Sequence, residues 1–201
     1  MTRSKKLALI QEELGDCKRC GLCEERKNIV FGVGNADAEL MFIGEGPGAD
    51  EDAQGEPFVG KAGQLLTKMI EAMGWTRDQV YIANTVKCRP PGNREPDEEE
   101  LSKCMPFLHQ QIRAIQPTVI ITLGRVATRV LTGVEDSMSR MHGKRYDLSL
   151  GDGTIIPIIP TFHPAFLLRT PSGKPFAWSD LKIARRLLIS HGATPSLKDK
   201  R

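Results

Sequence analysis

The feature that most constrains this chain is a short apolar run that ends in a glycine-rich, acidic loop. Residues 40–43 read Leu-Met-Phe-Ile, which is typical of a buried strand. The loop over 44–52 carries three glycines and four acidic residues. Glycines at the carboxyl end of a strand let a ligand approach the backbone, and in open α/β sheets ligands bind at that edge. The stretch therefore predicts a binding site at the end of a buried strand.

One familiar interpretation of such a loop is dinucleotide binding. Gly44, Gly46 and Ala49 fit the relaxed glycine pattern of those proteins, in which a helix N-terminus meets a pyrophosphate. Here the acidic side chains of the loop would face the phosphates and repel them. We therefore interpret the loop as one that orients a water molecule or stabilises a developing positive charge.

The overall composition is that of an ordinary globular protein. The 201 residues suit one domain, and a net charge of +3 permits a polyanionic partner without arguing for one. The apolar run at 7–10 is too short for the core of a signal peptide, and no stretch approaches the length of a membrane span. We expect a cytoplasmic protein with no membrane partner.

Apolar periodicity predicts alternating helices and strands. Helices are expected at 4–15, 60–73, 97–115, 125–133 and 176–189, and strands at 40–43, 80–86, 118–123, 146–150 and 154–159, the last two as a hairpin. This alternation predicts an α/β fold with three α/β/α layers and a central, mostly parallel sheet. We expect a single domain over 1–192, and a disordered basic tail over 193–201.

The five cysteines of the chain suggest a metal or redox site. An odd number in a cytosolic protein argues against a disulfide framework. Cys17, Cys20 and Cys23 form two overlapping C-x-x-C pairs, whereas Cys88 or Cys104 alone would be a small buried apolar residue. A C-x-x-C pair needs two more thiolates to complete a tetrahedral set, and four thiolates bind either zinc or an iron–sulfur cluster.

Four segments of the chain together resemble the family-4, iron–sulfur-containing uracil-DNA glycosylases. They are GEGPGADED (44–52), PFVGKAGQLL (57–66), NTVKCRPPGNREP (84–96) and HPAFLLR (163–169). The resemblance extends from about residue 17 to residue 188. It implies a uracil-DNA glycosylase fold, a [4Fe–4S] cluster, and excision of uracil from DNA by hydrolysis of the N-glycosidic bond.

The resemblance also implies roles for individual residues. The implied cluster ligands are Cys17, Cys20, Cys88 and Cys104. The implied catalytic residues are Glu45, Glu51, Asn93 and His163, and the implied base-binding residues are Gly46, Phe58 and Asn84. Cys23 has no counterpart in the usual family pattern, which leaves the choice of ligands slightly open.

The chemistry of these side chains agrees with the implied roles. Phe58 offers a face for base stacking, and the amide of Asn84 can pair with N3–H and O4 of uracil. His163 can donate a hydrogen bond to O2 of the leaving uracil. Taken singly, the same residues suit a core phenylalanine, a turn asparagine and a capping histidine. The sequence does not separate the roles of Glu45 and Glu51, since either can stabilise the sugar cation or orient water.

A DNA partner requires contacts to phosphates and to the vacated base stack. Basic candidates are Arg140, Lys144, Arg145, Arg169 and Lys174, and candidate apolar wedges are Leu167 and Leu168. A single surface lysine or arginine more often serves solubility alone, so this prediction depends on the clustering of the basic residues. We expect a monomer that acts on uracil-containing DNA, single- or double-stranded.

Three alternative functions stay open at this stage. One is a glycosylase with wider base specificity, and another is a relative that traps DNA covalently. Such cross-linking relatives carry an inserted basic loop with a reactive histidine, which is missing between Cys88 and Asp97. The third is a non-catalytic iron–sulfur module that binds nucleic acid or relays electrons. The acidic loop and His163 argue against that module, because pure binding has no use for them.

Overall fold

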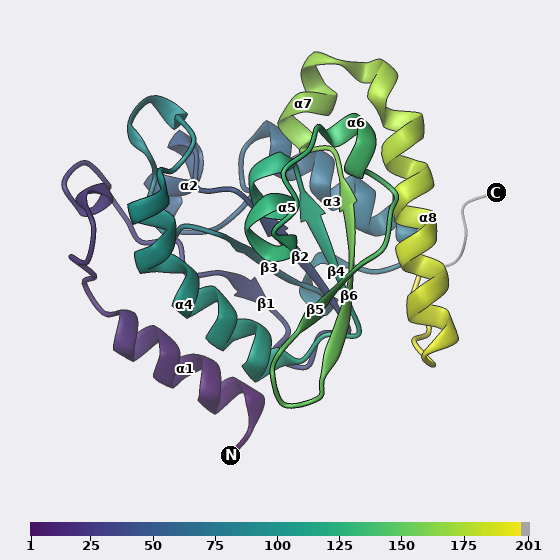
Figure 1. The fold of residues 1–201 in the computed structure, drawn as a ribbon, viewed down its shortest axis with the longest axis horizontal. Helices are drawn as coiled ribbons and strands as arrows, with labels where there is room; N and C mark the ends of the chain where they lie inside the picture. Colours follow the sequence, from purple (N-terminus) through teal and green to yellow (C-terminus); the bar gives the residue numbers. More distant parts are fainter. Residues whose placement is uncertain (198–201) are drawn as a thin grey trace.

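The computed structural model describes residues 1–197 as helices on both faces of one six-stranded sheet with the strand order β1-β3-β2-β4-β6-β5 (Figure 1). The strands are β1 (Val33–Gly34), β2 (Leu40–Gly44), β3 (Tyr81–Asn84), β4 (Val119–Leu123), β5 (Tyr146–Ser149) and β6 (Ile155–Thr161). The four inner strands run parallel, and the edge strands β1 and β5 pair antiparallel with β3 and β6. The predicted mostly parallel sheet is confirmed.

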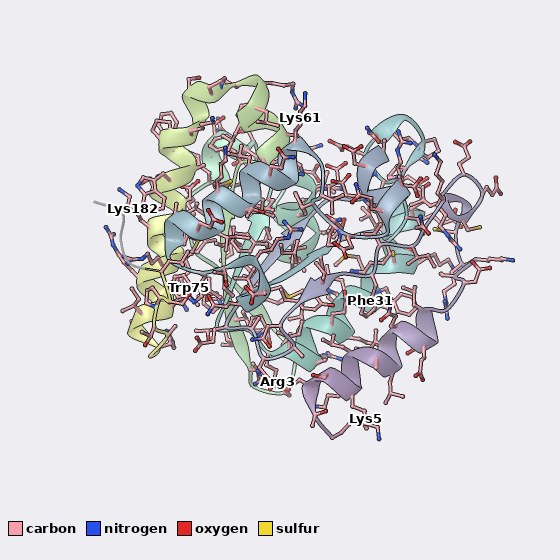
Figure 2. The ribbon with its side chains drawn as sticks, turned by 180° about the vertical axis from the view of Figure 1, so that it is seen from behind. Arg3, Lys5, Phe31, Lys61, Trp75 and Lys182 are labelled. Atoms are coloured by element: carbon pink, nitrogen blue, oxygen red, sulfur yellow. The ribbon has the colours of Figure 1, made fainter. Side chains whose placement is uncertain are left out.

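Helices cover the sheet on both faces, which confirms the predicted three layers. They are α1 (Arg3–Leu14), α2 (Ala49–Gln54), α3 (Lys61–Met73), α4 (Glu98–Ile115), α5 (Arg125–Thr132), α6 (Met138–Met141), α7 (Pro164–Arg169) and α8 (Lys174–Ser190). Figure 1 shows α1 beside α4 on one face, and Figure 2 shows α3 crossing the opposite face next to α8. Among the helices of residues 1–197, none is long and apolar enough to cross a membrane.

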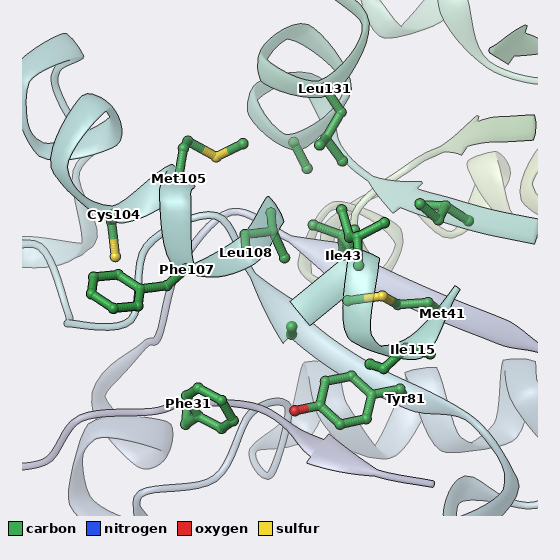
Figure 3. Close-up of a cluster of buried hydrophobic side chains, with 14 of the residues drawn as sticks. Phe31, Met41, Ile43, Tyr81, Cys104, Met105, Phe107, Leu108, Ile115 and Leu131 are labelled. Carbon is green, nitrogen blue, oxygen red and sulfur yellow. The ribbon is translucent and has the colours of Figure 1, made fainter. Parts of the chain in front are cut away.

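Each face of the sheet has its own core. Every residue of β2, β3 and β4 is buried, as expected for strands covered on both sides. Met41 and Ile43 point to the face of α1, α4 and α5, whereas Leu40 and Phe42 point to the face of α3 and α8. Figure 3 shows part of the first core, where Tyr81 lies next to Phe31.

Several short elements escaped the sequence prediction. The segments expected as loops at 28–37 and 44–52 contain β1 and most of α2, and the polar loop at 137–145 contains α6. These elements have two to six residues, which is too few for a periodic pattern. The first turn of α2 holds three acidic residues at the end where the helix dipole favours negative charge.

Residues 193–197, which were expected in the tail, contact the rest of the protein. Ala193 is buried, and the backbone N–H of Leu197 donates to the carbonyl of Gly74 at 2.9 Å. The side chain of Ser196 donates to that of Gln79 at 2.7 Å. The first part of the expected tail therefore packs against the end of α3, and its last part, 198–201, lies outside the described residues.

Helix α4 begins with a reciprocal cap. Asp97 accepts from the backbone N–H of Glu100 at 2.8 Å, and the Glu100 carboxylate accepts from the N–H of Asp97 at 2.9 Å. Arg94 also donates to both carboxylate oxygens of Glu100, at 2.6 and 2.8 Å. Glu100 is therefore structural, and its bonds tie the proline-rich loop to α4, which carries Cys104.

We predict that Asp97→Ala lowers the free energy of unfolding by about 1 kcal/mol, because the substitution leaves a helix N–H without its acceptor. Urea unfolding followed by circular dichroism measures the change. The matched control is Glu99→Ala, which removes an exposed acid of the same turn and should change stability by less than about 0.5 kcal/mol. Equal losses in the two variants would contradict the capping role.

Candidate active site

A cavity of about 390 Å³ opens where the carboxyl ends of β2, β3 and β6 meet the surface. Parallel strands present these ends at one edge of the sheet, so residues distant in sequence gather there. The lining residues are Glu45, Gly46, Pro47, Gly48, Glu51, Phe58, Ala62, Asn84, Pro90, Asn93, Arg94, His163, Ala165, Phe166 and Arg169. The seven residues predicted for catalysis and base binding all lie in this one cavity.

A glycine lies beside two residues of the cavity wall, Asn84 and Phe58. Gly44 ends β2 directly opposite Asn84 at the end of β3. A Cβ atom on Gly44 would lie 2.6 Å from Oδ1 of Asn84 and 2.6 Å from the ring of Phe58. The amide and the ring therefore approach one another only because this position has no side chain.

Asn84 is the most unusual polar group of the cavity. Its residue is 1% exposed, and its Oδ1 atom has no hydrogen-bond partner within residues 1–197. An unpaired buried acceptor costs free energy comparable to a lost hydrogen bond, and native proteins keep few of them. The amide is therefore prepared to bind a donor from a ligand rather than to stabilise a turn.

Glu51 holds the backbone of the aromatic wall. Its Oε1 atom accepts from the N–H groups of Val59 and Gly60 at 3.2 and 3.3 Å, and Oε2 accepts from Gly48 at 3.1 Å. These bonds fix Phe58, whose φ of 54° lies in the left-handed region that costs a non-glycine residue free energy. Both oxygens of Glu51 are thus engaged in holding two loops together.

Glu45 lies in a different environment from Glu51. Its backbone carbonyl accepts from the N–H of Val86 at 3.2 Å, which joins the loop after β2 to the loop after β3. Burial, and then the negative charge of Glu95, raise the pKa of the Glu45 carboxyl to about 7. A carboxyl with a pKa near neutrality at a cavity wall suits acid–base or electrostatic chemistry.

His163 caps the first turn of α7 and faces the ring of Phe58. Its Nδ1 atom accepts from the N–H of Ala165 at 3.0 Å, so the neutral ring carries its proton on Nε2. The His163 and Phe58 ring centres are 5.6 Å apart. Burial, and then the charge of Arg169, lower the pKa of His163 to about 4. The ring is therefore neutral at physiological pH, and its Nε2–H is a hydrogen-bond donor.

The proline-rich loop after β3 closes another wall. Asn93 has a φ of 58°, and its Oδ1 accepts from Nε of Arg89 at 2.8 Å. Arg94 also lines the cavity and pairs with Glu100. Arg94 was not predicted from the sequence as part of the site. The position of Arg94 directly after Asn93 in the same loop could have indicated that it belongs to the site.

The expected DNA-contacting residues divide into two groups. Arg169 lines the cavity, whereas Arg140, Lys144 and Arg145 are exposed on α6 and the loop that follows it. Arg140 lies 3.7 Å from Asp136, and Arg145 lies 2.9 Å from Asp147, so both side chains have acidic neighbours.

The two expected apolar wedges differ sharply in exposure. Leu167 is 1% exposed and belongs to the core between the sheet and α8, whereas Leu168 is 43% exposed. Neighbouring residues of a helix face different sides, so one can face the core while the next faces solvent. A helix of six residues is too short for its apolar periodicity to show which residue is buried. Burial removes Leu167 from the candidate wedges and leaves Leu168.

A second, smaller cavity gathers four of the five cysteines, all of which are free thiols. Its cysteines are Cys17, Cys20, Cys88 and Cys104, and Cys23 does not line it. Arg19 and Arg26 donate to the sulfurs of Cys17 and Cys88 at 3.4 Å each, and the N–H of Lys87 donates to Cys104 at 3.2 Å. Burial raises the pKa of Cys88 to about 11.

This donor set fits a metal cofactor. Four thiols line one small cavity, and N–H groups that donate to sulfur stabilise the negative charge that metal-bound thiolates carry. Within residues 1–197, no three His, Cys, Asp or Glu side chains converge on a position for one ion, so the structure assigns no single-ion site.

A buried lysine joins the two cavities. Lys87 is fully buried, and its ammonium donates to the carbonyl of Asn84 at 2.9 Å and to Oε1 of Gln111 at 2.7 Å. Burial lowers its pKa to about 8. Gln111 in turn donates to the carbonyl of Phe31 at 2.9 Å and to the hydroxyl of Tyr81 at 3.3 Å. The backbone of Asn84 is thus anchored to α4 and to the cysteine cavity.

Comparison with known proteins agrees with this geometry. An open, mostly parallel sheet with a cavity at its carboxyl edge defines an α/β enzyme fold, and residues 31–182 match the model of the uracil DNA glycosylase superfamily.

Among curated proteins, the type-4 uracil-DNA glycosylase of Sulfurisphaera tokodaii is 45% identical over 189 residues, covering 92% of this chain and 86% of that protein. Those of Archaeoglobus fulgidus and Thermotoga maritima are 44% and 43% identical, each covering 86% of this chain and 88% of the relative. The chain therefore belongs to the type-4 family of the uracil-DNA glycosylase superfamily.

We predict that Glu51→Gln lowers the free energy of unfolding by about 1–2 kcal/mol, because an amide has one acceptor oxygen for three backbone N–H groups. Glu56→Gln, an exposed change in the same loop, is the matched control and should be neutral. Thermal and urea unfolding measure both variants. An unaltered stability in Glu51→Gln would show that these bonds do not hold the loops.

Proposed function

We propose that this protein removes uracil from DNA by hydrolysing the N-glycosidic bond, leaving an abasic site. The observation that carries the proposal is the unpaired, buried Oδ1 of Asn84, which lines the same cavity as the ring of Phe58. A base extruded from the DNA helix needs such a pocket, with an aromatic face for stacking and a polar group for reading its edge. The family membership of the chain supports the same activity.

The amide of Asn84 supplies the base selectivity. Its Oδ1 accepts from N3–H of uracil, and its Nδ2 donates to O4. Cytosine lacks the N3 proton and carries an amine at C4, so it leaves buried groups of the site unpaired. Phe58 stacks on the base. Gly46 lines the same cavity and leaves no room for a side chain, because a Cβ atom there would come within 2.8 Å of the Val86 side chain.

His163 acts on the leaving group. As the glycosidic bond breaks, negative charge develops on uracil, and Nε2–H of His163 donates to O2 of that anion. A neutral imidazole suits this task because its Nε2–H can form a hydrogen bond with O2 without transferring the proton to uracil. The bond from Ala165 to Nδ1 holds the required tautomer before substrate binds.

Glu45 acts on the sugar, whereas Glu51 holds the loops of the cavity in position. The ionised Glu45 carboxylate stabilises the positive charge that develops on the sugar and orients the attacking water. Glu51 is a positioning residue because its oxygens bind backbone N–H groups. Asn93 lies on the cavity wall with its Nδ2 group available to the DNA backbone or the attacking water.

The four cysteines of the second cavity would hold a [4Fe–4S] cluster. The ligands would be Cys17, Cys20, Cys88 and Cys104, which tie the N-terminal loop to the proline-rich loop and to α4. When bound, the cluster supplies a structural cross-link. Hydrolysis of the glycosidic bond needs no electron transfer, so the reaction is carried by the residues of the first cavity.

The proposed activity is tested with a labelled oligonucleotide that contains one uracil. After incubation with the protein, alkali cleaves the strand wherever an abasic site has formed. We expect cleavage at uracil and none in the matched oligonucleotide with thymine or cytosine. A strand that stays intact after long incubation with the purified holoprotein would overturn the proposal.

We predict that His163→Ala lowers the single-turnover excision rate by about a hundredfold or more, since one preorganised donor to the leaving group is lost. DNA affinity, measured with a non-cleavable uracil analogue, should change little. His191→Ala, at the exposed end of α8, serves as the control and should keep the wild-type rate. A near-normal rate in His163→Ala would place the donor elsewhere.

We predict that excision accelerates as the pH rises through about 7, because the pKa of Glu45 is raised to about 7 and only the ionised carboxylate stabilises the cation. His163 has a pKa of about 4 and stays neutral over this interval. Single-turnover rates between about pH 5 and pH 9 test the dependence. Glu45→Gln should be slow and lose this inflection; an unchanged profile in that variant would contradict the assignment.

We predict that anaerobically purified protein contains iron and sulfide and absorbs broadly near ~400 nm. Cys88→Ser should bleach this absorbance, whereas Cys23→Ser should keep it because Cys23 lies outside the cysteine cavity. Metal analysis and visible spectra provide the measurement. Stoichiometric zinc without iron or sulfide would rule out the cluster.

A further inference from the structure

A row of four aromatic rings leads away from the cavity. Phe166 lines the cavity, and its ring centre lies 5.3 Å from that of Phe162 in a stacked arrangement. Phe162 lies 4.9 Å from His142, and His142 lies 5.8 Å from Phe176. Phe176 is 57% exposed, so the row runs from the cavity wall to open solvent. We call these four residues the aromatic row.

The middle of the row is held rigidly. Nδ1 of His142 lies 3.0 Å from a carboxylate oxygen of Asp180, which is 2% exposed and also accepts from the hydroxyl of Thr161 at 2.8 Å. Gly143 has a φ of 69°, and a Cβ atom there would lie 2.6 Å from the same carboxylate. The loop and the ring are therefore preorganised, which lowers the entropic cost of binding a partner.

Basic residues flank the aromatic row on each contributing element. Lys144 follows His142 by two positions, Lys174 precedes Phe176 by two, and Arg169 follows Phe166 by three. All three are exposed, and neither lysine forms an ion pair within residues 1–197. Figure 1 shows α6, α7 and the first turns of α8 gathered at the same end of the molecule.

We propose that the aromatic row, with its flanking basic residues, is a binding surface for the unpaired DNA strand beside the extruded uracil. This inference extends the proposed function and names the form of DNA that the site accepts outside the cavity. Exposed aromatic rings next to basic side chains bind single strands, because bases stack on the rings while phosphates meet the positive charges.

The observations favour an unpaired strand over a duplex. The bases of a duplex are stacked on one another, so an exposed ring such as Phe176 has no free base face to bind there. An unpaired strand offers that face at every nucleotide. Because Phe166 lines the cavity, the aromatic row is continuous with the proposed base-binding site, and one strand can occupy both.

The test measures binding of the holoprotein to an oligothymidylate of about 15 nucleotides that lacks uracil. We expect Phe176→Ala to weaken this binding about tenfold, and Phe176→Tyr, which keeps the ring, to bind as wild type. Trp178→Ala is the matched control, because Trp178 is 38% exposed on the same helix but belongs to no ring contact of the row. Circular dichroism confirms that each variant is folded.

Two further measurements sharpen the result. Lys144→Ala should reduce the salt dependence of single-strand binding, whereas Phe176→Ala should leave the salt slope unchanged. Phe176→Ala should bind duplex DNA as wild type and excise uracil from it at the wild-type single-turnover rate.

Wild-type single-strand affinity in folded Phe176→Ala would overturn the inference, and so would equal losses with Trp178→Ala or with duplex DNA. Because the oligothymidylate contains no uracil, this outcome is independent of catalysis. A protein that fails to excise uracil but shows the Phe176-dependent binding would contradict the proposed function while supporting the aromatic row.

Discussion

The structure depends on the close approach of two strand ends at Gly44. Parallel pairing places Gly44 opposite Asn84, and the space that a Cβ atom would fill is taken by the Asn84 amide and the Phe58 ring. Any side chain at this point would push the Asn84 amide away from the Phe58 ring. The same loop then joins the next strand through the carbonyl groups of Gly44 and Glu45, which accept from the N–H groups of Thr85 and Val86.

Burial at this edge of the sheet shifts the pKa values of two polar side chains in opposite directions. It raises the pKa of Glu45 toward neutrality and lowers that of His163, so the carboxylate can titrate near physiological pH while the imidazole stays neutral. It also leaves Oδ1 of Asn84 without a partner. Glu51, by contrast, is saturated by backbone donors and gives the surrounding loops their shape.

Buried polar groups connect the cavity at the carboxyl edge of the sheet to the cysteine cavity. Lys87 reaches the carbonyl of Asn84 with its ammonium and the sulfur of Cys104 with its backbone N–H. Arg94 binds Glu100 at the start of α4 and lines the first cavity. A cross-link among the cysteines would thus restrain the same loops that shape the base-binding site.

Local patterns in the sequence were sufficient to predict the main helices and strands, whereas the residues of the site were implied by the family resemblance. The apolar runs at 40–43 and 118–123 predicted buried parallel strands, and both lie in the centre of the sheet. The resemblance implied site roles for Glu45, Asn84 and His163, and these residues line one cavity because carboxyl ends of parallel strands share one edge. The short elements β1, α2 and α6, of two to six residues, were not predicted, because they are too short to show a periodic pattern.

The sequence by itself determined the fold class and the order of the main helices and strands, and its resemblance to a known family named the residues that could do chemistry. Only the tertiary structure separated Glu45 from Glu51, excluded Cys23 from the cysteine cavity, buried Leu167 and aligned the aromatic row. The reason is physical. Periodicity and turn chemistry act between near neighbours, whereas burial, hydrogen-bond saturation and ring contacts depend on groups that the folded chain brings together from distant positions.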